Sequence, residues 1–146
     1  MRLGRYAEAA MRLEQVTRKK PNETVAHLFL AKCRYAMGDY ELALAAAKTG
    51  LGDEPENPDL LIQCALCADA AGYDEQAYEF AGRLLETEIA HVAIPRGNVM
   101  RLFRPIERLF GVSSINALAR VNQDRIREYD WAKRYRRKYE RRQSDS

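Results

Sequence analysis

A regular period of 34 residues constrains this chain more than any other feature. Gly4, Gly38 and Gly72 lie 34 residues apart, and an alanine follows each glycine five positions later. Pro21 and Pro55 each lie 17 positions after the glycine that precedes them. A period of about 20–50 residues is typical of stacked supersecondary units. We therefore expect the glycines at turns between helices, and the alanines where two helices cross closely.

The repeated phrase resembles the tetratricopeptide repeat over about residues 1–90. The resemblance implies an all-α fold, a right-handed α-α superhelix or solenoid, with C-terminal capping helices. The expected divisions are repeats over 1–94 (a half repeat at 1–21, full repeats at 22–55 and 56–89), capping and projecting helices over 95–142, and a disordered tail at 143–146.

Apolar spacing and breaker residues predict the helix bounds. The five helices of the repeats are expected at 5–20, 25–37, 40–51, 59–71 and 74–89. The first of these is in register with the second helix of a unit whose first helix is missing. Because each unit buries its apolar surface only against its neighbours, either the chain is a fragment or something else covers that open end.

The C-terminal region departs from the repeat. Asn98 can cap a short helix that Pro105 kinks or splits. A long helix is expected from Ser113 or Ser114 to about 142. Its apolar residues change face along its length, so we expect the early half to cover the end of the solenoid and the later half to project.

Composition indicates an ordinary soluble protein, with 47% hydrophobic and 31% charged residues. No apolar run approaches the ~20 residues that a membrane span needs, and no secretory signal is recognisable. The three cysteines are an odd number inside helical segments, which argues against a disulfide framework. A reducing compartment follows, and the cytoplasm is the predicted location.

The resemblance also implies a binding site, because the first helices of tetratricopeptide units line a concave groove that holds a peptide or a helix. The groove residues implied here are mainly apolar with a few charges: Val25, Leu28, Phe29, Lys32, Tyr35, Asp59, Ile62, Gln63, Leu66 and Asp69. Two alternatives are open. A partner protein fills this groove, or the chain's own C-terminal helix or a second copy does, since an exposed apolar groove is costly.

The remaining candidates favour structural roles. Cys64 and Cys67 lie three residues apart, but neither a second pair nor nearby histidines complete a metal site, so they and Cys33 are expected in the core. His27 and His91 are isolated in the pattern. We find no catalytic motif and no phosphate-binding glycine loop. The sequence therefore predicts a protein that is not an enzyme and needs no cofactor or metal.

The C-terminal helix carries a basic tail. Residues 120–146 hold ten Lys/Arg and five Asp/Glu, whereas the rest of the chain holds 14 and 16. Aromatic residues alternate with the basic ones at Trp131, Tyr135 and Tyr139. The basic set is Lys133, Arg134, Arg137, Lys138 and Arg141. Such residues can bind phosphates while aromatic rings stack on bases, dock on an acidic protein or anionic membrane surface, or form a solvated helix end.

Together these patterns predict a non-catalytic protein–protein interaction module, an adaptor or assembly factor that binds a partner segment in its groove. A homodimer through the first helix is also plausible. The alternative function is binding of nucleic acid or an anionic surface through the basic C-terminal helix.

Overall fold

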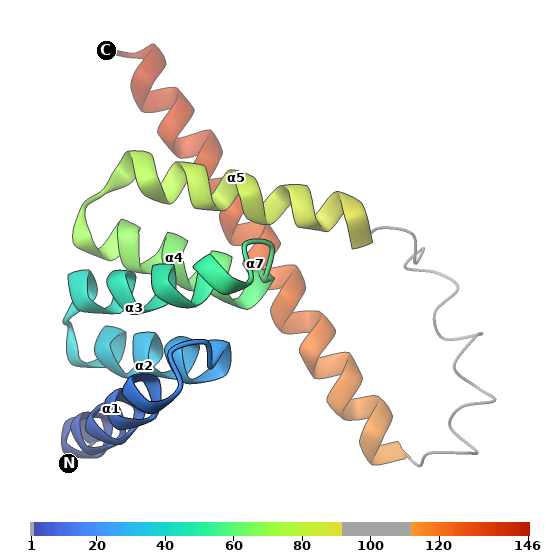
Figure 1. Cartoon of the computed structure of the whole chain (residues 1–146). Helices are drawn as coiled ribbons and strands as arrows, with labels where there is room; N and C mark the ends of the chain where they lie inside the picture. Colours follow the sequence, from blue (N-terminus) through green and yellow to red (C-terminus); the bar gives the residue numbers. More distant parts are fainter. Residues whose placement is uncertain (1, 92–111) are drawn as a thin grey trace.

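The computed structural model describes residues 2–91 and 112–146, which form helices joined by short turns. The helices are α1 (Arg2–Lys19), α2 (Thr24–Met37), α3 (Tyr40–Asp53), α4 (Pro58–Ala71), α5 (Asp74–His91) and α7 (Val112–Ser144). The described ranges contain no strand, and consecutive helices from α1 to α5 pack side by side in one stack (Figure 1). The all-α solenoid is confirmed. The short helix predicted to begin at Asn98 lies outside the described residues.

Two of the three repeat glycines make the turns that the period predicts. Gly38 and Gly72 end α2 and α4 with φ of 85° and 82°, a left-handed conformation that costs least for glycine. The amide of Gly38 donates to the carbonyl of Tyr35 at 3.0 Å, which closes the last turn of α2. The same prediction was wrong for Gly4. It lies inside α1, because α1 already begins at Arg2.

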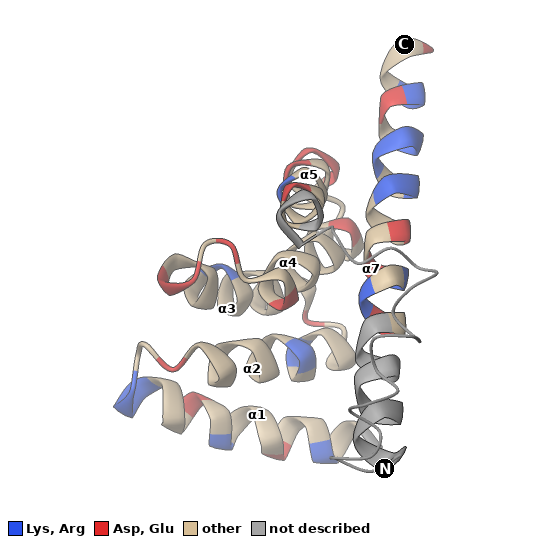
Figure 2. Cartoon of the chain, turned by 90° about the vertical axis from the view of Figure 1, so that its right-hand side faces the viewer, with Lys and Arg blue, Asp and Glu red and all other residues tan. Residues whose placement is uncertain are grey.

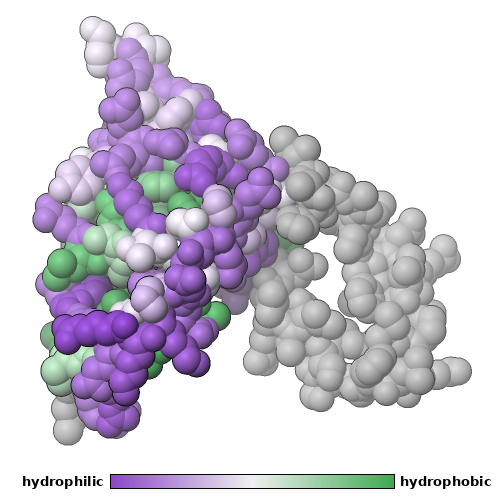
Figure 3. Space-filling model, viewed as in Figure 1, coloured by the Kyte–Doolittle hydropathy of each residue, from purple (hydrophilic) through white to green (hydrophobic). Residues whose placement is uncertain are grey.

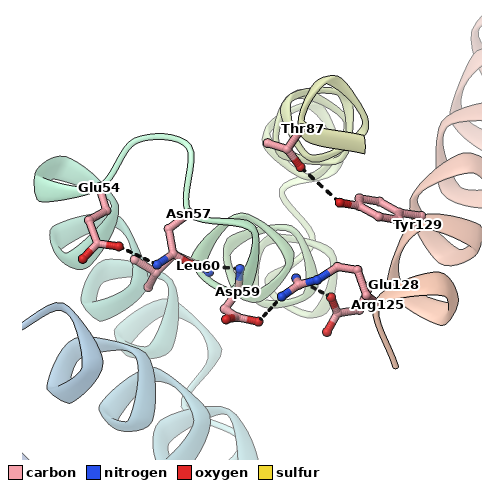
Figure 4. A network of polar contacts seen from close by, with 8 residues as sticks. All are labelled: Glu54, Asn57, Asp59, Leu60, Thr87, Arg125, Glu128 and Tyr129. Atoms are coloured by element: carbon pink, nitrogen blue, oxygen red, sulfur yellow. Dashed lines mark hydrogen bonds and ion pairs between the residues drawn. The ribbon is translucent and has the colours of Figure 1, made fainter. Parts of the chain in front are cut away.

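Helix α4 begins where the sequence signals it most clearly. Pro58 occupies the first turn, and the Asn57 side chain accepts hydrogen bonds from the amides of Asp59 and Leu60 at 3.0 and 3.3 Å. The Asn57 amide group in turn donates to Glu54 at 2.7 Å (Figure 4). This capping satisfies backbone donors that a helix start leaves unpaired, and it fixes the direction in which α4 leaves the turn.

Small residues let the helices of the stack approach closely. Ala43, Ala47, Ala77 and Ala81 are fully buried in the main core, together with Leu84. A second, smaller cluster joins α1 to α2 through Ala10, Leu30 and Cys33. Seen from the side of α3, the surface is largely hydrophilic, with hydrophobic residues gathered between α5 and α3 and near α1 and α2 (Figure 3).

Helix α7 runs antiparallel to α5. Tyr129, near the middle of α7, lies 3.4 Å from the hydroxyl of Thr87, late in α5. Tyr139, late in α7, stacks on Tyr78, early in α5, with ring centroids 4.8 Å apart. Helix α7 therefore packs on α5 in the opposite direction, and it crosses the stack instead of adding a parallel layer to it (Figure 1). It extends through Ser144, two residues beyond the expected end.

Candidate protein-binding groove

The α2 half of the predicted groove is open to solvent. Val25 and Phe29 are 56% and 50% exposed, which is high for apolar side chains on one helix. The Lys32 ammonium lies 5.6 Å from the centre of the Phe29 ring. Leu28 and Tyr35 are half-buried and pack against the main core, and Tyr35 meets Tyr40 edge-on at 5.2 Å.

The α4 half is closed. Ile62 and Gln63 are each 6% exposed, and Leu66 is half-buried against the main core. The Gln63 side chain donates a hydrogen bond to the sulfur of Cys67 at 3.3 Å, so its amide has a partner inside the protein. Asp59 and Asp69 remain exposed, one in the first turn of α4 and the other near its end. The structure thus brings the predicted residues onto two neighbouring helices, but the apolar residues that stay exposed, Val25 and Phe29, are both on α2.

Helix α7 contributes to this closure. The Arg125 guanidinium of α7 bonds Asp59 at 2.8 Å and Glu128 at 2.7 Å (Figure 4). Tyr129 and Ala132 of α7 are buried in the same core cluster as Ile62. Seen from the side, α7 lies along the stack beside α4 and α5 (Figure 2). The chain's own C-terminal helix therefore borders the groove at α4.

The charges of α7 also reach the carboxylates that flank this contact. Burial raises the pKa of Glu128, and the cations of Arg125 and Lys32 oppose that rise. Burial likewise raises the pKa of Asp69, with Asp74 adding to the rise and Lys138 and Arg142 opposing it. Cations of α7 thus lie near both ends of α4, so the contact is polar at its rim and apolar at its centre.

The later half of α7 packs against the stack as far as Tyr139, and its exposed C-terminal end extends beyond α5 (Figure 1). Tyr129 and Ala132 are buried, and the Tyr135 hydroxyl lies 3.1 Å from a carboxylate oxygen of Asp74. Trp131 and Tyr135 stack on each other at 5.2 Å. These aromatic residues form the apolar side of α7, and this side faces the stack. The side chains of 112–122, in the early half, lie outside the described residues.

The basic tail lies on the outer side of the same helix. Arg134, Arg137, Lys138 and Arg141 are exposed and line one surface pocket with Arg142 and Asp145, whereas Lys133 is half-buried. Blue residues gather along this part of α7 in Figure 2, whereas red ones mark the turns and helices of the repeats. Trp131, Tyr135 and Tyr139 are half-buried and already stack on other rings of the chain, so base stacking would have to replace these contacts. Nucleic-acid or anionic-surface binding here remains a prediction.

The cysteines and His27 lie in the core. Cys33, Cys64 and Cys67 are free and buried, and burial raises the pKa of Cys64 to about 12. The Nε2 atom of His27 lies 2.8 Å from the carbonyl of Pro21, and it carries the hydrogen because a carbonyl only accepts. Within residues 2–91 and 112–146, no group of three or more His, Cys, Asp or Glu is arranged to hold a metal ion. The His91 side chain lies outside the described residues.

Comparison with known families supports the repeat. A tetratricopeptide repeat family model matches residues 1–51, which span α1, α2 and most of α3. A search of curated proteins finds no match. Among the helices described here, none is long and apolar enough to cross a membrane. Tetratricopeptide repeats generally mediate protein–protein interactions and are typically not catalytic.

Proposed function

We propose that this chain, which matches a tetratricopeptide repeat family model over residues 1–51 and folds as a helical repeat stack, acts as an adaptor or assembly factor. It would bind a segment of a partner protein on the α2 side of its predicted groove. The observation that carries this proposal is the pair of exposed apolar side chains, Val25 and Phe29, beside Lys32. The closed α4 half leaves α2 as the accessible wall.

The chemistry of this wall indicates what the partner offers. An apolar residue that covers Phe29 would remove water from a ring that is now half-exposed. Full burial of a Val or Phe side chain contributes about 1.5–3 kcal/mol, so covering the exposed part gives roughly half of that for each. Lys32 would favour a carboxylate beside the apolar anchor. The proposed ligand is thus an apolar segment with an acidic residue next to its anchor.

The test begins with a pull-down by the intact chain to identify a partner, followed by titration of that purified partner. Phe29→Ala should weaken affinity about tenfold, since 1.4 kcal/mol corresponds to a factor of ten. Leu42→Ala is the matched control, because Leu42 is 56% exposed but lies on α3, outside the predicted groove. Equal affinities of the two variants would refute binding at α2.

Location in a reducing compartment such as the cytoplasm is part of this proposal. Three free, buried thiols support it.

A further inference from the structure

The outer side of α7 carries three arginines that have no acidic partner in the described structure. Arg134, Arg137 and Arg141 follow one another at steps of three and four, so they lie on one side of the helix, and all three are exposed. None of the ion pairs among the described side chains involves them, whereas Arg142 pairs with Asp74. We call Arg134, Arg137 and Arg141 the arginine stripe.

Positive charge is concentrated at the arginine stripe. The surface pocket that the stripe lines holds five cationic residues and one carboxylate, that of Asp145. Asp130 and Asp145 lie one turn before and one turn after the stripe, and Glu140 accepts a hydrogen bond from the Tyr78 hydroxyl of α5 at 2.9 Å. Residues 1–119 hold 14 basic and 16 acidic residues, so they add no net attraction for an anion. An anionic ligand is therefore drawn to α7.

The stripe lacks the apolar side chains that a protein partner or a membrane would use. Among the described side chains of α7, Ile126 is the large apolar one that is exposed, and it lies eight residues before Arg134. Protein interfaces depend on a few buried aromatic or aliphatic anchors, and a helix that lies on a membrane buries an apolar face. The stripe therefore recognises its ligand by negative charge alone.

The spacing of the stripe favours a ligand with closely spaced charges. It extends seven residues, about 10.5 Å along the helix axis. A nucleic-acid duplex carries one charge per about 1.7 Å of its axis, so about six phosphates lie along that length. A fully acidic extended polypeptide offers about half as many, because its residues are roughly 3.3 Å apart. The planar guanidinium group also binds phosphate oxygens in a bidentate manner.

We propose that the arginine stripe binds the phosphate backbone of duplex nucleic acid. Proteins that bind single strands stack bases on aromatic rings, but Trp131 and Tyr135 stack on each other and Tyr139 stacks on Tyr78. Contacts to phosphates carry no sequence information, so the binding has no base preference. This site lies on α7 and is independent of the proposed groove on α2.

Fluorescence anisotropy of a labelled DNA duplex of mixed sequence, titrated with the intact chain at several salt concentrations, tests the proposal. Three phosphate contacts give a slope of about −3 in the plot of log K against log salt. Arg137→Gln with Arg141→Gln removes two of them, so the slope should become shallower by about 2 and the affinity at low salt should fall at least about tenfold.

Lys19→Gln with Lys20→Gln is the matched control, because it makes the same change in net charge at exposed positions at the end of α1. Circular dichroism would verify that both double variants fold. Equal losses of affinity in the two variants, or an unchanged slope in the α7 variant, overturn the proposal. Phe29→Ala should leave duplex binding unchanged, so failure of the groove on α2 would be seen separately.

Three further ligands at equal concentration of negative charge test the chemical class: a single strand of the same sequence, polyglutamate, and vesicles of phosphatidylserine and phosphatidylcholine. The duplex should bind most tightly, and the emission of Trp131, the single tryptophan of the chain, should stay unchanged. Tighter binding of the single strand with quenching of Trp131 would indicate base stacking. Tighter binding of polyglutamate or of the vesicles would indicate an acidic protein or a membrane. Each of these results overturns the proposal.

Discussion

Adding one methyl group at Gly50 tests how tightly the repeats pack. A Cβ at this position would lie 2.9 Å from the Cβ of His27 and 3.2 and 3.3 Å from the two methyl carbons of Leu60. The hydrogen bond of His27 to Pro21 restrains its ring, so relief requires α2 and α3 to move apart. Such overpacking costs about 1–3 kcal/mol. Replacing glycine by alanine inside a helix by itself adds about 1 kcal/mol to the free energy of unfolding. This gain offsets part of the overpacking cost, so Gly50→Ala should lower the free energy of unfolding by about 1 kcal/mol in total.

Gly52→Ala is the matched control in the same helix. No heavy atom lies within 4 Å of its Cβ position, so this variant should gain about 0.5–1 kcal/mol. The assay is urea unfolding followed by circular dichroism. With a slope of about 1–3 kcal/mol per molar urea, a loss of 1 kcal/mol lowers the midpoint by about 0.3–1 M. If Gly50→Ala is as stable as Gly52→Ala, the close contact between α2 and α3 does not govern packing as we argue.

Three further predictions concern α7 and the core. Tyr135→Phe removes the hydroxyl that bonds Asp74 and should lower the free energy of unfolding by about 1 kcal/mol in urea titration; no change would mean that water replaces the bond. The thiol of Cys64 keeps its proton to about pH 12 in the folded state but only to about 9.0 when unfolded. Below pH 9 the thiol is protonated in both states, so its titration does not change the free energy of unfolding. Above pH 9 the unfolded chain loses this proton first, so the difference in unfolding free energy between the native chain and Cys64→Ala should fall by up to about 1.4 kcal/mol per pH unit. A difference that stays constant above pH 9 would contradict the burial of Cys64. If the basic tail binds nucleic acid, the double substitution Arg137→Glu with Arg141→Glu should lower the salt-dependent retention of the protein on an RNA column. This double variant is preferable to truncation before Lys133, because truncation would also remove the packed side chains of Tyr135 and Tyr139. Unchanged retention would dismiss that site.

The repeat itself could be predicted from sequence because its signals are local. Spacing of apolar residues, Asn57-Pro58 and the glycines at 38 and 72 placed the ends of α2 to α4 within two residues. These features act through backbone geometry and capping within a few residues of each turn. Such local signals predict where a helix begins and ends without any knowledge of what packs against it.

The groove could be predicted only in part, because its outcome depends on contacts between distant residues. Nothing near Ile62 or Gln63 in sequence indicates that α7 lies beside α4. The inward direction of Tyr135 and Tyr139 was missed because the basic residues between them suggested an exposed surface. A sharper signal was available. Tyr129, Ala132, Arg136 and Tyr139 share one side of a helix at steps of three and four.

The docking of α7 onto α5 also has a consequence for the order of folding. Contacts from α1 to α5 join helices that follow one another in the chain or, for α2 and α4, are one helix apart. By contrast, the bond between Tyr78 and Glu140 spans 62 residues and that between Asp59 and Arg125 spans 66. Closing long loops costs entropy before the contacts form, so the five N-terminal helices should assemble rapidly and α7 should arrive last. On heating, α7 should be the first helix to dissociate from the rest of the stack.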